Sequence, residues 1–180
     1  YKMAKSGLNV PDFVVIPPDA FSLYKKTNNI EEKITEVLQS DRSSKEKSKE
    51  IESLILGGSW EKSSELKSFI EEAYKTLAKA CISVRSSALD EDSAGHSFAG
   101  QLSSYLFIES LEDTFESLRK CWASAFSERS LVYRAENKLE LFDIGVAVVF
   151  QDMVFADSAG VLFSADPISK NPDHAIINAV

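Results

Sequence analysis

Residues 82–104 read ISVRSSALDEDSAGHSFAGQLSS, and this stretch decides the fold and function expected of the chain. Its first three residues are apolar or β-branched around a serine and predict a short strand, after which Arg85 leads into a polar segment. A guanidinium offers fork-shaped donors that suit phosphate oxygens, and Gly100 would let the backbone approach a ligand closely. The pattern indicates a phosphate-binding loop, although an isolated Arg-Ser-Ser string is also typical of a solvated surface loop.

Apolar patterns on both sides of this stretch predict further strands and helices. Strands are expected at residues 10–16, 103–108, 144–150, 160–164 and 175–177. The run at 144–150 is nearly continuous in apolar residues, which suits a strand covered on both faces. Helices are expected over residues 19–79, and from Ser110, a capping residue with Asp113 three positions on, to about residue 137. The fold class predicted is mixed α/β, an α+β arrangement of two layers.

Composition limits the classes of function. The 180 residues are 44% hydrophobic and 27% charged, as in globular domains with a real core. The net charge of −8 argues against a broad surface for nucleic acid or anionic membrane, and no apolar run approaches the ~20 residues of a membrane span. Cys81 and Cys121 form no Cys-x-x-Cys motif and are expected to be core residues, so a reduced, cytoplasmic setting is the default.

Three blocks of the stretch follow one another in a specific order. They are Val84 to Ala88, then Glu91-Asp92, then Ser97 to Gln101. These blocks resemble the signature of the ATP-binding domain shared by phosphoenolpyruvate synthase, pyruvate phosphate dikinase and rifampicin phosphotransferase. The pattern in that family is Val-Arg-Ser-Ser-Ala, an acidic pair, and Ser-Phe-Ala-Gly-Gln.

Three further segments resemble the same family. Residues 7–15 are similar to its Gly-x-x-Val-Pro-x-Gly-Phe segment, with Asp12 where a glycine is usual. Residues 121–134 resemble its Cys-Trp-Ala-Ser helix, which ends in Tyr-Arg. Residues 148–167 resemble its Val-Gln-x-Met-Val strand and the Ala-Gly-Val-Leu-Phe-Thr-x-Asp-Pro hairpin after it. The resemblance covers almost the whole chain and is weakest between residues 21 and 79.

The resemblance implies the ATP-grasp fold, with residues 1–180 as the N-terminal portion of a nucleotide-binding domain. It also implies a set of site residues: Arg85 as phosphate ligand and catalytic residue, Gly100 and Ser104 along the loop over the phosphates, and Gln151, Met153 and Val154 at the adenine edge. An arginine can neutralise charge that develops on a transferring phosphoryl group, and a methionine side chain can pack on a purine. Taken without the resemblance, Met153 and Val154 are more typical of a core and Gln151 of a surface.

The resemblance further implies a dikinase-like phosphotransferase that uses Mg-ATP to phosphorylate a histidine on a separate domain of the parent chain. Pyruvate or another small acceptor would bind on a further domain. Residues 1–180 would then be a partial domain, inactive alone, because the family's Gly-Gly-Lys segment and its magnesium ligands find no match in the sequence. The metal ligands are therefore expected outside it. His96 is not expected to accept the phosphoryl group, since it stands at a variable position of the pattern.

Other functions stay open at the level of sequence. Rifampicin phosphotransferase and glucan water dikinase use the same chemistry on other acceptors. A non-catalytic regulatory module that keeps the ATP-grasp shell is a second alternative, which Asp12 in place of glycine favours. An ATP-dependent ligase of the wider ATP-grasp group is a third, and a pocket for a carboxylate substrate would support it.

Overall fold

A computed structural model provides the structure of the chain and describes residues 5–77, 80–88, 103–137, 139, 141–142, 144–166, 168–169 and 171–180. Two sheets are described. The first has four antiparallel strands in the order β1-β4-β2-β3, and the second is an antiparallel pair, β5-β6. The strands are β1 (Phe13–Ile16), β2 (Ile82–Ala88), β3 (Ser104–Ile108), β4 (Val146–Asp152), β5 (Gly160–Phe163) and β6 (Ile176–Ala179).

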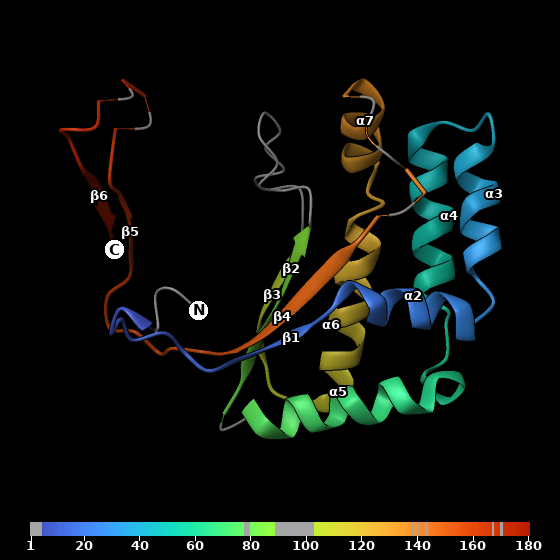
Figure 1. Cartoon of the computed structure of the whole chain (residues 1–180), viewed down its shortest axis with the longest axis horizontal. Coiled ribbons are helices and arrows are strands. Elements are labelled where there is room, and N and C mark those ends of the chain that lie inside the picture. The colour runs from blue at the N-terminus through green and yellow to red at the C-terminus, as the bar shows by residue number, and fades with distance from the viewer. Residues whose placement is uncertain are drawn as a thin grey trace.

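Helices fill most of the chain between β1 and β2 and between β3 and β4. They are α2 (Pro18–Thr27), α3 (Glu31–Gln39), α4 (Ser44–Leu56), the 3-10 helix η1 (Trp60–Ser63), α5 (Ser64–Leu77), α6 (Leu111–Ser124) and α7 (Glu128–Glu136). Figure 1 shows them gathered on one side of the four-stranded sheet, with the β5-β6 hairpin standing apart on the other. None of the described helices is long and apolar enough to cross a membrane.

The four-stranded sheet has one buried face and one open face. Successive side chains of a strand point to opposite faces, and in β4 the fully buried residues are Val146, Val148 and Phe150. These pack with the helices into one core. We call the other side of the sheet the open face; its residues are Phe13, Val15, Ser83, Arg85, Ser87, Ser104, Ala147, Val149 and Gln151.

An aromatic cluster joins the helices behind the sheet. The ring of Trp122 in α6 lies 5.1 Å from Phe21 and 5.1 Å from Tyr24 in α2, and 5.9 Å from Trp60 in η1, measured between ring centroids. Aromatic side chains bury large apolar areas and gain from such stacked and tilted contacts. The cluster therefore makes α6 a rigid support for the strands that it covers.

The predicted strands and the helical region are confirmed, with differences at the boundaries. Ser110 accepts a hydrogen bond from the amide of Asp113 at 3.0 Å, so the predicted cap of α6 is present. The single helix expected up to residue 137 is instead two, because the hydroxyl of Ser127 accepts from the amide of Ser130 and starts α7 anew. Cys81 and Cys121 are buried, as predicted.

The prediction that both faces of residues 144–150 are covered is wrong for the part of the chain that the structure describes. Residues 147 and 149 of β4 are only half-buried, whereas residues 146, 148 and 150 are completely buried. The apolar run arises because a half-buried position between β1 and β2 still favours a β-branched residue such as Val149, and Ala147 is small enough to be tolerated there. A continuous apolar run therefore did not distinguish one covered face from two.

Candidate functional site

Arg85 and Ser104 lie side by side on the open face. They are cross-strand partners in the β2-β3 pair, and both are exposed. Directly opposed residues in an antiparallel pair have Cβ atoms about 4.5–5.5 Å apart. The guanidinium and the hydroxyl can therefore act on one ligand group.

Gln151 lies on the same face, two positions further along β4. Arg85 pairs with Val149, and Gln151 pairs with Ser83 of β2 and with Phe13 of β1. Diagonal neighbours of this kind are about 7–8 Å apart. The backbone carbonyl of Gln151 also accepts from the Ser83 hydroxyl at 3.3 Å, which fixes this end of the strand.

The chain beyond β4 continues past the end of the sheet. The amide of Met153 donates to the carbonyl of Cys81 at 3.1 Å, and the amide of Asp152 donates to the carbonyl of Asp12 at 3.0 Å. Met153 is half-buried and Val154 is 61% exposed. Because the Met153 amide is already hydrogen-bonded, a nucleobase could contact the Met153 side chain but could not accept from the Met153 N–H. The amide of Val154 has no partner among the described residues.

The predicted residues that the structure describes thus form a strip across β3, β2 and β4 and the segment after β4. Arg85 and Ser104 stand at one end, and Met153 comes four residues after Val149, about 13 Å along the chain at 3.3 Å per residue. Gly100 and His96 lie outside the described residues.

Two aromatic residues that sequence reasoning missed stand beside the Met153 end. Phe107 and Phe155 are 56% and 69% exposed, and their ring centroids are 6.1 Å apart. The β2-β3 register shifts between the pairs Ile82↔Ile108 and Val84↔Tyr105, so β3 has one residue more than β2 there, and Phe107 adopts φ 57°. A β-bulge with a left-handed residue usually uses glycine. Only the position of Phe155, directly after Val154, could have drawn attention to it from sequence.

The thiol of Cys121 lies beneath the site, on the buried side of the sheet. Burial raises its pKa to about 12, against smaller lowering effects of hydrogen bonds from Ser86. The thiol is therefore protonated at neutral pH, and Cys121 is unsuited to act as a nucleophile.

The whole chain, residues 1–180, matches the family described as pyruvate phosphate dikinase, AMP/ATP-binding domain. The chain belongs to this family. A probable phosphoenolpyruvate synthase of Methanocaldococcus jannaschii is 35% identical over 189 residues, which covers 99% of this chain and 16% of the relative. The phosphoenolpyruvate synthase of Aquifex aeolicus is 32% identical over 96% of this chain and 22% of its own length.

A third relative bears a different enzyme name from the first two. The rifampicin phosphotransferase of Bacillus cereus is 44% identical over 88 residues, 49% of this chain and 10% of the relative. The resemblance inferred from the motifs is confirmed by these matches. The chain is thus an AMP/ATP-binding domain of the phosphoenolpyruvate synthase and pyruvate phosphate dikinase type, with an antiparallel sheet in a mixed α/β fold, and it spans less than a quarter of each relative named here.

Proposed function

We propose that the open face is one wall of a nucleotide site in a dikinase-type phosphotransferase. The full-length protein would use Mg-ATP to phosphorylate a histidine on a separate domain, which would pass the phosphoryl group to pyruvate or another small acceptor. In this proposal residues 1–180 form the N-terminal portion of an ATP-grasp nucleotide-binding domain. The observation that carries it is the pairing of Arg85 with Ser104 on an exposed sheet face, within a chain of the AMP/ATP-binding family.

The phosphates would lie at the Arg85 end of the strip. Arg85 is charged at any physiological pH, and its planar fork can bind two phosphate oxygens at once. The Ser104 hydroxyl beside it can donate one further hydrogen bond. As charge shifts during phosphoryl transfer, a fixed guanidinium stabilises it without reorganisation, so Arg85 is the catalytic residue of this proposal. The family motif alone leads us to assign Gly100 to the same phosphate-binding end.

The base would lie at the other end of the strip. Gln151, Met153 and Val154 remain our candidates for the adenine edge, and Phe107 and Phe155 add an apolar border next to them. A purine ring is flat and largely apolar, so it gains by covering such exposed side chains.

Magnesium, bound with ATP, would neutralise part of the charge of the phosphates. The described residues contain no group of three or more His, Cys, Asp or Glu side chains that could hold a metal ion. In our proposal the metal ligands lie outside residues 1–180, in the segments where the family motif places them.

Asp12, which the sequence offered in favour of a non-catalytic module, fits the sheet without strain. It directly precedes β1, and its carbonyl accepts from the amide of Asp152. Among the described residues, positive φ values occur only at Gly7, Asn29 and Phe107, so position 12 does not require a glycine. The backbone at position 12 therefore gives no conformational reason for a glycine.

The test is ATP binding by the full-length protein, measured by calorimetry with magnesium present. Arg85→Ala should weaken binding by about 1.5–3 kcal/mol, the value of hydrogen bonds to a charged group. Arg85→Lys should recover part of this loss, because it keeps the charge and loses the fork. Arg129→Ala is the matched control, since Arg129 is exposed on α7, away from the open face.

Each outcome separates the candidate functions. ATP binding that depends on Arg85, with an acid-labile phosphohistidine formed on incubation, supports the dikinase reaction. Binding without a phosphorylated histidine would favour the regulatory module, and an acyl-phosphate product would favour the ligase. If the protein does not bind ATP, or if Arg129→Ala costs as much as Arg85→Ala, the proposed site is wrong.

A further inference from the structure

The last turn of α6 contacts both ends of the segment 82–104, at Val84 and at Ser103. Cys121 and Ser124 are three residues apart, so they share one face of the helix, whereas Trp122 between them packs into the aromatic cluster. Their common neighbour is Ser103, which directly precedes β3. Across from Ser103 stands Ser86 of β2, and we call the place where Ser86 and Ser103 pair the neck.

Every backbone polar group of Ser103 is bound at the neck. Its carbonyl accepts from the amide of Ser86 at 3.2 Å, from the Ser86 hydroxyl at 2.7 Å and from the Cys121 thiol at 3.7 Å. Its amide donates to the hydroxyl of Ser124 at 3.3 Å, and that hydroxyl donates in turn to the carbonyl of Cys121 at 2.7 Å. The same thiol lies 3.8 Å from the carbonyl of Val84.

These contacts adjoin the Arg85–Ser104 pair on both strands. Ser86 follows Arg85 directly, and Ser104 follows Ser103 directly. A shift of Ser103 away from α6 would therefore move the hydroxyl of Ser104 relative to the guanidinium across from it. Groups that bind a ligand together lose much of their joint effect when one is displaced by an ångström.

We propose that Ser86, Cys121 and Ser124 are positioning residues that fix Ser103 and thereby hold Arg85 and Ser104 in register for the nucleotide phosphates. This rests on the proposed function, since it assumes that these two side chains bind phosphate. The proposal assigns a role to the Cys-Trp-Ala-Ser motif. Trp122 packs in the core and fixes α6, and Cys121 and Ser124 connect α6 to Ser103 at the neck.

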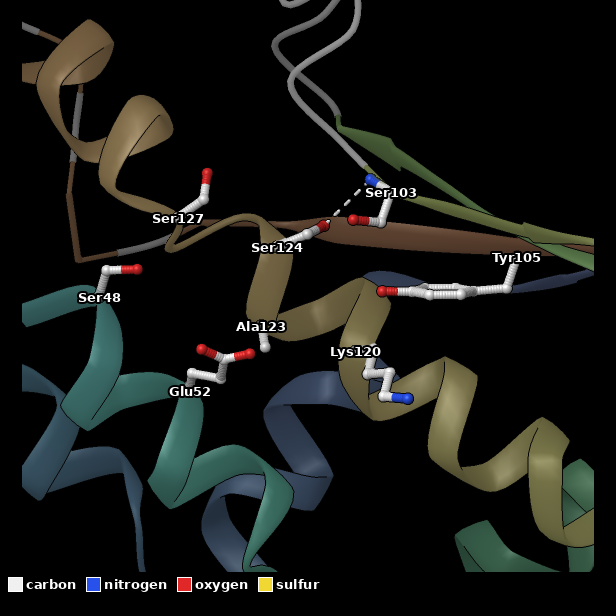
Figure 2. Close-up of a pocket in the computed structure, with 8 residues that line it drawn as sticks. All are labelled: Ser48, Glu52, Ser103, Tyr105, Lys120, Ala123, Ser124 and Ser127. Atoms are coloured by element: carbon white, nitrogen blue, oxygen red, sulfur yellow. Dashed lines mark hydrogen bonds between the residues drawn. The ribbon is translucent and has the colours of Figure 1, made fainter. Parts of the chain in front are cut away.

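Figure 2 shows that the Ser124–Ser103 hydrogen bond borders an open, polar cavity. The cavity has a volume of about 380 Å³, and its lining residues are Ser48, Glu52, Ser103, Tyr105, Lys120, Ala123, Ser124 and Ser127. Water can reach the Ser103 amide from this side and satisfy it if the Ser124 hydroxyl is removed. We therefore expect Ser124→Ala to fold, while the position of Ser103 becomes less defined.

The experiment compares ATP with adenosine in the full-length protein. Ser124→Ala should weaken ATP binding by roughly 5–30-fold, the effect of one or two kcal/mol, because a positioning bond at the phosphate end is lost. The affinity for adenosine, which lacks phosphates, should fall by less than about 2-fold, within the scatter expected of a surface change. Ser124→Thr keeps the hydroxyl and should restore ATP binding.

Two controls separate positioning from general weakening of the fold. Ser127→Ala removes a hydroxyl that lines the same cavity and caps α7 without bonding to the neck, and it should leave both affinities unchanged. Hydrogen exchange of the Ser103 amide, measured without nucleotide, should be faster in Ser124→Ala than in Ser127→Ala. Should Ser124→Ala fail to fold, Ser86→Ala removes the 2.7 Å bond to the Ser103 carbonyl and tests the same point.

The inference is overturned if Ser124→Ala weakens the binding of ATP and of adenosine equally, or if it leaves the binding of both unchanged. If the unmodified protein does not bind ATP, the proposed function fails and the positioning role fails with it. If the unmodified protein binds ATP and Ser124→Ala binds it equally well, only the positioning role fails.

Discussion

Replacing either of the two exposed aromatic residues at the adenine end of the strip should weaken the binding of adenosine, AMP and ATP by the same factor. The ring centroids of Phe107 and Phe155 lie 6.1 Å apart, and the two residues are 56% and 69% exposed. If they border the base, alanine at either position removes apolar cover from adenine and leaves the phosphates untouched. The effect should therefore not depend on the number of phosphates.

The magnitude follows from the exposed area of one ring. A Phe side chain presents about 200 Å², so the 56% exposed at Phe107 is about 110 Å². Covering half of this area at about 25 cal/mol per Å² is worth about 1.4 kcal/mol, a tenfold change in affinity. This value lies within the 1–3 kcal/mol that alanine substitution at an aromatic base-stacking residue usually costs.

Calorimetric titration of the full-length Phe107→Ala and Phe155→Ala variants with the three ligands measures this factor. Phe69→Ala is the matched control, because Phe69 is 42% exposed on α5, on the helix side of the sheet. A loss for ATP without a loss for adenosine would refute the assignment of the base to this end. An equal loss in the Phe69→Ala variant would show that the effect is not local.

Three further predictions concern stability. Phe107→Gly should be more stable than Phe107→Ala by about 1 kcal/mol in urea unfolding, because φ 57° is unfavourable for any residue with a Cβ; equal stabilities would argue against the bulge. Gly58→Ala should lose about 1–3 kcal/mol, since its Cβ would overlap the buried ring of Tyr24, and an unchanged melting temperature would contradict this packing. Burial raises the pKa of Cys121 from 9.0 to about 12, so above pH 9 the folded state keeps a proton that the unfolded state loses. The contribution of the protonated thiol to the free energy of unfolding should therefore be fully present below pH 9 and should be lost as the pH rises from about 9 to 12. Over this range the free energy of unfolding should fall more steeply than in Cys121→Ala.

Local features of the fold could be predicted from sequence, and features that depend on distant contacts could not. The Ser110 cap and the strand at residues 104–108 depend on a few neighbouring residues, so their patterns are visible in the chain. The interruption between α6 and α7, the strand order β1-β4-β2-β3 and the bulge at Phe107 depend on which segments meet. No periodicity in the sequence predicts these contacts between distant segments.

The candidate site shows the same division. The family motif identified Arg85 and Ser104, and the structure adds that they are opposed across two strands. The bond from the Ser103 amide to Ser124 joins residues 21 apart in sequence, and neither serine has a distinctive sequence context for this role. The sequence therefore offered candidates for contact with the ligand, but no candidates for the residues that would hold them in place.

The core and the site specify the same register of β4, and this links stability to function in one element. Val148 and Phe150 are completely buried, while Val149 and Gln151 face the other way, beside Arg85 and Ser83. Because side chains alternate with a period of two, a slip of one residue would place Gln151 in the core and Phe150 on the open face. Burying an unpaired amide and exposing a phenylalanine would both be unfavourable, so the slipped register is rejected by the core. The pairing that places Val149 next to Arg85 is therefore held by residues on the opposite face of the sheet.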